Sequence, residues 1–118
     1  MFDILDLMNI LYLLTFPIML LVFGIFFTLG YPRERNRHFG FRTPITMRSP
    51  RIWRYAHDTA AKPTLYSGII LTVVCAILLF LTKGRVAYWQ ATLIFIVSAV
   101  IFILIVQYVN RKIKDNFP

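Results

Sequence analysis

Residues 10–31, ILYLLTFPIMLLVFGIFFTLGY, form a run of 22 positions without a charged side chain, and this run decides the class of fold. Two more uncharged runs follow at residues 64–82 and 86–110. A helix rises about 1.5 Å per residue, so about 20 residues cross a hydrocarbon core that is roughly 30 Å thick. We therefore predict an all-α integral membrane protein with three transmembrane helices, at about residues 10–31, 64–82 and 86–109, in a single membrane domain, residues 1–118.

The composition of the whole chain supports this class. Of the 118 residues, 58% are hydrophobic and 15% are charged, whereas a soluble domain has about 45–50% apolar and about 25% charged residues. Asp3 and Asp6 do not fit the positively charged start of a signal peptide, so we expect the first span to be retained. The single cysteine, Cys75, excludes a disulfide framework within the chain and a multi-cysteine metal site.

The 13 Lys and Arg residues are unevenly divided between the two sides of the predicted bundle. Eight lie in the segment 32–63 and three lie in the C-terminal tail, whereas the turn between the second and third spans holds only Lys83 and Arg85. The positive-inside rule therefore predicts that the segment 32–63 and the C-terminus are cytoplasmic and that the N-terminus is outside. Because this basic excess follows the topology and contains no DNA-binding motif, we expect no direct nucleic-acid partner.

The segment 32–63 is predicted to be a structured basic loop that ends in a short helix. Gly40 and Pro44 favour a turned backbone in its first half. Ser49, which is directly followed by a proline, has the features of a helix N-cap. The helix is predicted to end at Lys62, because a second proline comes next.

One face of this predicted helix carries small and aromatic side chains at helical spacing, and the basic residues lie elsewhere. The face consists of Trp53, Ala56, His57 and Ala60. Two interpretations remain open. The helix is either an interfacial amphipathic helix that Trp53 anchors in the membrane surface, or a connecting helix that extends the second span beyond the bilayer.

Nine positions of this segment form a specific pattern. They are Asn36, Gly40, Arg42, Thr43, Pro44, Thr46, Ser49, Trp53 and His57. With its Gly-x-Arg-Thr-Pro core followed by a tryptophan, the segment resembles the signature loop of the SdpI-like family. These are bacterial membrane proteins named for immunity to a secreted toxin, the sporulation-delaying protein. The resemblance implies a multi-pass protein of the bacterial cytoplasmic (inner) membrane that protects against a membrane-active peptide.

Two alternative functions remain beside toxin immunity. The founding member of the family also draws a transcriptional repressor to the membrane, so the chain is alternatively a signalling module with a basic docking loop. A third possibility is a protein that binds lipid headgroups. The guanidinium of Arg42 is central, because arginine pairs with a carboxylate or phosphate through two parallel hydrogen bonds. The expected partners are therefore the lipid bilayer with its anionic headgroups, a peptide toxin or a regulatory protein.

The sequence gives little support for an enzyme. The only histidines are His38 and His57, and their spacing requires no metal site. No ionisable side chain lies within a predicted span, which argues against a pump or a coupled transporter formed by one subunit. We expect no catalytic residue, no metal and no cofactor.

Small residues within the spans predict close packing between helices. Gly68, Thr72 and Ala76 repeat every four residues on the second span, and Gly24 lies in the first. Packing within one chain is the preferred interpretation, and a homo-oligomer formed through a spare face stays open. Pro17 lies inside the first span and predicts a mild kink there.

Overall fold

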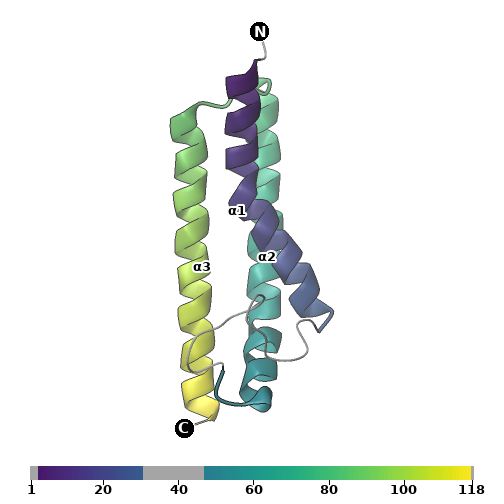
Figure 1. Cartoon of the computed structure of the whole chain (residues 1–118), viewed down its shortest axis with the longest axis vertical. Helices are drawn as coiled ribbons and strands as arrows, with labels where there is room; N and C mark the ends of the chain where they lie inside the picture. Colours follow the sequence, from purple (N-terminus) through teal and green to yellow (C-terminus); the bar gives the residue numbers. More distant parts are fainter. Residues whose placement is uncertain (1–2, 31–46, 118) are drawn as a thin grey trace.

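The computed structural model describes residues 3–30 and 47–117, which contain three helices and no strand. The helices are α1 (Ile4–Thr28), α2 (Pro50–Thr82) and α3 (Tyr88–Asn116). They run side by side along the long axis, with the two termini at opposite ends (Figure 1). Each helix is long and apolar enough to cross a membrane. The predicted class is confirmed: the chain is a multi-pass α-helical membrane protein.

Two helices extend beyond the spans that hydropathy predicts. α1 begins six residues before position 10, because Asp3 and Asp6 form a reciprocal cap in which each backbone N–H donates to the other carboxylate at 3.0 Å. α3 continues to Asn116, beyond the predicted end at residue 109, and so holds the basic tail in helical form. Hydropathy marks only the part of a helix that lies in lipid, and it therefore misses charged ends that stay helical.

α2 is one continuous helix of 33 residues, and the predicted end at Lys62 is wrong. The helix continues through Pro63, whose ring nitrogen has no hydrogen to donate to the carbonyl of Thr59. A separate short helix is not observed, so the second interpretation, an extension of the span, describes the structure. Because 33 residues rise about 50 Å, α2 extends about 20 Å beyond a 30 Å hydrocarbon core.

α1 and α2 approach each other most closely at two glycines. A Cβ atom added to Gly24 would lie 2.4 Å from the Cα of Leu65, and one added to Gly68 would lie 2.4 Å from the backbone nitrogen of Leu21. Each glycine therefore lets the backbone of the other helix occupy the place of a side chain. Packing through small residues within one chain is confirmed at this crossing, although Ala76 is exposed and lies outside it.

α1 bends about halfway along its length, close to its internal proline (Figure 1). Pro17 cannot donate to the carbonyl of Leu13, and that carbonyl instead faces the thiol of Cys75 on α2, with the sulfur 4.0 Å from the oxygen. The hydroxyl of Thr15 bonds to the carbonyl of Leu11 at 2.6 Å, one turn earlier. The predicted kink is confirmed, and the buried cysteine is the group that compensates for it.

α3 completes two separate hydrophobic cores along the bundle. The core near the N-terminal end contains Leu13, Cys75, Val86 and Ala91. The larger core lies at the C-terminal end, where alanines of α2 face branched residues of α3; it contains Phe27, Ile52, Ala56, Ala60, Ala61, Ile105, Val109 and Ile113. The small side chains of α2 let α3 lie close to the part of α2 that extends beyond the span.

Candidate functional site

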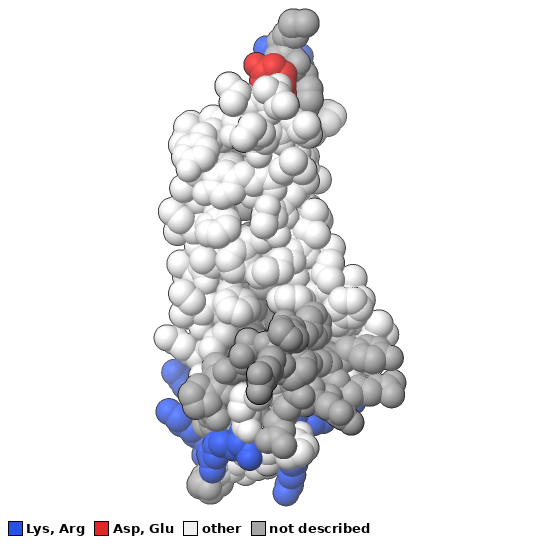
Figure 2. All heavy atoms as spheres, in the orientation of Figure 1, with Lys and Arg blue, Asp and Glu red and all other residues white. Residues whose placement is uncertain are grey.

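The charged side chains separate to the two ends of the molecule (Figure 2). The end near the C-terminus, called the basic end below, carries Arg48, Arg51, Arg54, Lys62, Arg111, Lys112 and Lys114. The opposite end carries Asp3, Asp6, Lys83 and Arg85. The predicted charge asymmetry is therefore present in the described residues, and the described residues of the sequence pattern, Ser49, Trp53 and His57, lie at the basic end.

The structure describes three of the nine candidate residues. Ser49, Trp53 and His57 lie on the first turns of α2, and the other six lie outside the described residues; these are Asn36, Gly40, Arg42, Thr43, Pro44 and Thr46. The Oγ of Ser49 accepts a hydrogen bond from the backbone N–H of Ile52 at 3.1 Å, as the N-cap prediction requires. Ser49 thus fixes the first turn on which the other two side chains stand.

Trp53 and His57 form a buried aromatic pair at the centre of the basic end. Their ring centroids are 4.3 Å apart, and the edge of His57 also meets the ring of Phe27 on α1, at 5.0 Å between centroids. Trp53 is fully buried and His57 is 2% exposed. Trp53 therefore does not anchor the helix in a membrane surface, which corrects that interpretation; it packs inside the protein.

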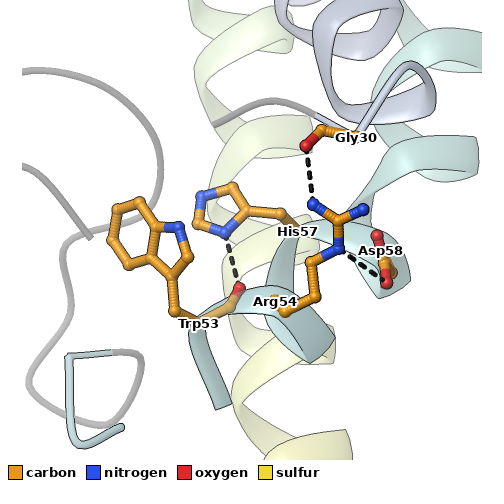
Figure 3. Close-up of polar contacts among 5 residues, drawn as sticks. All are labelled: Gly30, Trp53, Arg54, His57 and Asp58. Atoms are coloured by element: carbon orange, nitrogen blue, oxygen red, sulfur yellow. Dashed lines mark hydrogen bonds and ion pairs between the residues drawn. The ribbon is translucent and has the colours of Figure 1, made fainter. Parts of the chain in front are cut away.

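One hydrogen bond defines the tautomer of His57. Its Nδ1 lies 2.7 Å from the backbone carbonyl oxygen of Trp53, one turn earlier on α2 (Figure 3). A carbonyl oxygen only accepts, so Nδ1 carries the proton and donates it. In the neutral ring, Nε2 is then the acceptor nitrogen.

Burial also sets the charge of this ring. His57 lies on the part of α2 that extends beyond the span, and burial lowers its pKa below the ordinary value of 6.5. The hydrogen bond to Trp53 and the charge of Asp58 oppose this shift, and Arg54 adds to it. A neutral imidazole at neutral pH follows, held with one nitrogen donating and one able to accept.

Arg54 connects the end of α1 to the first turns of α2 (Figure 3). Its Nη1 donates to the carbonyl oxygen of Gly30 at 2.7 Å, and its Nε lies 3.5 Å from Oδ2 of Asp58. Gly30 has a φ of 90°, a conformation that suits glycine, and an added Cβ would lie 2.9 Å from Nη2 of Arg54. The Arg54–Asp58 ion pair is exposed and contributes about 0.5 kcal/mol or less to stability. The hydrogen bond to Gly30 is therefore the contact through which Arg54 holds the end of α1 against α2.

Sequence reasoning did not identify this connection. The Arg54–Asp58 spacing of four residues signals an ion pair on a helix, and a glycine after an apolar run signals a helix end. Neither signal shows that Arg54 reaches Gly30, which lies 24 positions earlier in the chain. That contact depends on how α1 and α2 cross.

A groove with a cavity volume of about 450 Å³ lies between the first turns of α2 and the last turn of α3. We call it the terminal groove; it is lined by Arg51, Arg54, Tyr55, Asp58, Asn116 and Phe117. The side-chain amide of Asn116 donates to the hydroxyl of Tyr55 at 2.9 Å, and the guanidinium of Arg51 stacks 5.2 Å from the ring centroid of Phe117. The groove presents oriented donors and aromatic edges, a combination suited to an anionic segment.

Among residues 3–30 and 47–117, no group of His, Cys, Asp or Glu side chains is arranged to hold a metal ion. The buried imidazole of His57 contacts aromatic rings and a backbone carbonyl. The geometry of the described site is thus that of a packed scaffold with charged side chains around it.

Fold and site together define a small membrane protein whose described residues form three helices with a basic end. A comparison with family models matches residues 33–109 to the SdpI/YfhL protein family, and the chain belongs to this family. The matched region includes most of the segment between α1 and α2, together with α2 and most of α3. Searches among curated proteins and among solved structures give no match.

Proposed function

We propose that this protein protects a bacterial cell against a membrane-active peptide toxin, as the SdpI-like resemblance implies. The proposed location is the inner membrane, with the N-terminus outside and the basic end in the cytoplasm. Family membership supports the proposal. We propose no catalytic reaction and no cofactor for the chain.

The observation that carries a mechanism is a groove at the end opposite the basic one. This outer groove has a cavity volume of about 430 Å³ and is lined by Leu5, Met8, Asn9, Tyr12 and Tyr88. Under the proposed topology it opens on the side from which a secreted peptide arrives. Two hydrogen bonds hold its wall: the Asn9 side chain donates to the backbone carbonyl of Val86 at 3.0 Å, and the Tyr12 hydroxyl donates to the side-chain hydroxyl of Thr92 at 3.2 Å.

The outer groove suits an apolar peptide helix or its aromatic end. Leu5 and Met8 are well exposed, and the rings of Tyr12 and Tyr88 lie 5.5 Å apart between centroids. Methionine and aromatic side chains adapt to varied apolar partners. Capture there would keep a toxin from assembling in the bilayer.

Expression in a toxin-sensitive strain tests this role, with survival against a panel of membrane-active peptides as the readout. We expect the wild-type chain to protect against a member of the panel and Leu5→Trp, which fills the groove, to lose most of that protection. Leu11→Trp is the matched control, because Leu11 is similarly exposed on α1 and does not line the groove. Unchanged sensitivity with the wild-type chain would count against immunity itself.

The terminal groove favours a second candidate function, recruitment of a regulatory protein to the membrane. Arg51 stacks on Phe117 and, among the described residues, has no hydrogen bond or ion pair, so its donors remain for a carboxylate of a partner. The groove stands at the tip of α2, beyond the level of the bilayer. A soluble protein can therefore reach it.

Recruitment is tested by imaging a repressor encoded by a neighbouring gene and fused to a fluorescent protein. We expect it at the membrane with the wild-type chain and in the cytosol with Arg51→Ala. Arg111→Ala is the control, because Arg111 is also exposed at the basic end and does not line the groove. Equal membrane localisation in all three strains would exclude the terminal groove as the docking site.

Binding of lipid headgroups is the third candidate from the sequence. The residue on which it was based, Arg42, lies outside the described residues. The described part of the chain contains a different site with this chemistry.

A further inference from the structure

Two hollows of different polarity meet on the surface of the bundle, and they share Pro63 and Tyr108. The first has a cavity volume of about 580 Å³, and its lining includes Asp58, Thr59 and Lys62. The second has a volume of about 300 Å³ and is otherwise lined by Ile101, Leu104 and Ile105. The first, called the polar hollow below, contains charged side chains beside apolar surface, and the second is almost wholly apolar. Together they form an amphipathic groove.

The groove lies at the depth where headgroups meet hydrocarbon. Lys62 precedes the outer end of α2 by about 20 residues, and Tyr108 follows Tyr88 on α3 by about the same number, which is about 30 Å in each case. Tyr66 and Tyr108 thus occupy the interfacial position that tyrosine prefers. From Tyr108 the apolar hollow runs back along α3 through Leu104 to Ile101, toward the middle of the bilayer.

The polar hollow contains both signs of charge. Lys62 is exposed, and the ammonium of Lys112 lies 5.8 Å from the ring centroid of Tyr108, at the rim. Two acceptors lie opposite. Arg54 contacts Oδ2 of Asp58, and the second carboxylate oxygen has no partner in the described part of the chain.

The other acceptor is a consequence of the proline in α2. Pro63 has no N–H for the carbonyl of Thr59, and both residues line the hollow. A carbonyl oxygen without its helical partner accepts a hydrogen bond from a bound donor, and an ammonium group is a strong donor. The hollow therefore matches a ligand that carries an anionic and a cationic group.

We propose that this groove binds a phospholipid with a primary-amine headgroup, phosphatidylethanolamine. The ammonium group lies against Asp58 and the Thr59 carbonyl, the phosphate lies against Lys62 at the interface, and one acyl chain occupies the hollow along Ile101 and Leu104. This site is independent of the toxin-immunity role, because none of its residues lines the outer groove. With the terminal groove it shares only Asp58.

Native mass spectrometry tests the site, on protein released from nanodiscs that contain equal amounts of phosphatidylethanolamine, phosphatidylglycerol and phosphatidylcholine with identical acyl chains. We expect the wild-type chain to retain phosphatidylethanolamine in preference to the other two lipids. Lys62→Gln removes the partner of the phosphate, and Leu104→Trp fills the apolar hollow; each is expected to lower retention about tenfold.

Two matched variants serve as controls, Lys114→Gln and Leu93→Trp. Lys114 is exposed at the basic end, Leu93 is exposed on the apolar surface of α3, and neither lines the groove. Both are expected to retain the lipid as the wild type does. Equal retention of the three lipids by the wild type, preferential retention of phosphatidylglycerol, or equal retention by all variants would each overturn the proposal.

Discussion

At the scale of single residues, His57 links the chemistry of the basic end to its stability. Its ring is buried against Trp53 and Phe27, and its Nδ1 proton is held by the Trp53 carbonyl. Among the described residues, the charges of Asp58 and Arg54 act in opposite directions on its pKa: Asp58 raises it and Arg54 lowers it. The net effect of burial is that the folded protein binds a proton at His57 less readily than the unfolded chain does.

The stability of the protein should therefore fall in mild acid. Above the ordinary histidine pKa of 6.5 the ring is neutral in both states and the fold has its full stability; below it the unfolded chain takes up the proton first. We expect the thermal unfolding midpoint in detergent to be lower at pH 5.5 than at pH 7.5. His57→Gln should remove most of this dependence. Parallel pH profiles for the wild type and His57→Gln would contradict the assignment.

The predictability of individual residues depends on how local their contacts are. The orientation of Trp53 and His57 follows from helical spacing, and the cap at Ser49 follows from its position before a proline. The hydrogen-bond partners of Arg54 and Asn116 could not be predicted, because Gly30 and Tyr55 are distant from them in the sequence. A sequence pattern predicts which side chains share one face of a helix. Which other element packs against that face depends on how the helices cross in space.

At the scale of elements, the close approach of α1 and α2 depends on two backbone positions. Gly24 and Gly68 each receive the backbone of the other helix, at a place where a Cβ has no room. The three described helices and the place of their apolar parts were predictable, because charge-free runs of this length have few other solutions. The continuity of α2 was not, because a proline ends most helices and is accommodated here on a partly exposed face.

Gly68→Ala should destabilise the bundle by about 1–3 kcal/mol, because the added methyl group overpacks a backbone contact. Gly24→Ala should have a similar effect for the same reason. Ala76→Val adds two methyl groups to the exposed surface of α2 and should leave stability nearly unchanged. The measurement is reversible unfolding in mixed micelles. If Ala76→Val lowered the free energy of unfolding as much as Gly68→Ala, the close approach of α1 and α2 would not explain the effect of the Gly68 substitution.

At the scale of the whole molecule, charge and shape are arranged along one axis. The bundle measures 56 × 21 × 20 Å, with the basic end and the acidic N-terminus at opposite ends of its long dimension (Figure 2). A bilayer core of about 30 Å leaves part of this length outside the hydrocarbon. Most of the excess belongs to α2 and the last turns of α3, at the basic end.

The proposed orientation has a direct test in cysteine labelling of intact cells. In a Cys75→Ser background, a cysteine introduced by Arg85→Cys should react with a membrane-impermeant maleimide, and one introduced by Lys114→Cys should react only after permeabilisation. Both positions are exposed at opposite ends of the bundle. The reverse pattern would invert the topology and place the outer groove in the cytoplasm.

Because α2 continues through Pro63, a change in the tilt of its membrane segment also moves its cytoplasmic tip under the proposed topology. One rigid rod joins the lipid-embedded segment to a tip about 20 Å beyond the hydrocarbon. A helix adjusts to a thinner or thicker membrane by changing its tilt, and a change of about 10° would move such a tip sideways by about 3 Å. Whatever binds at the tip is thereby exposed to the thickness of the membrane beneath it.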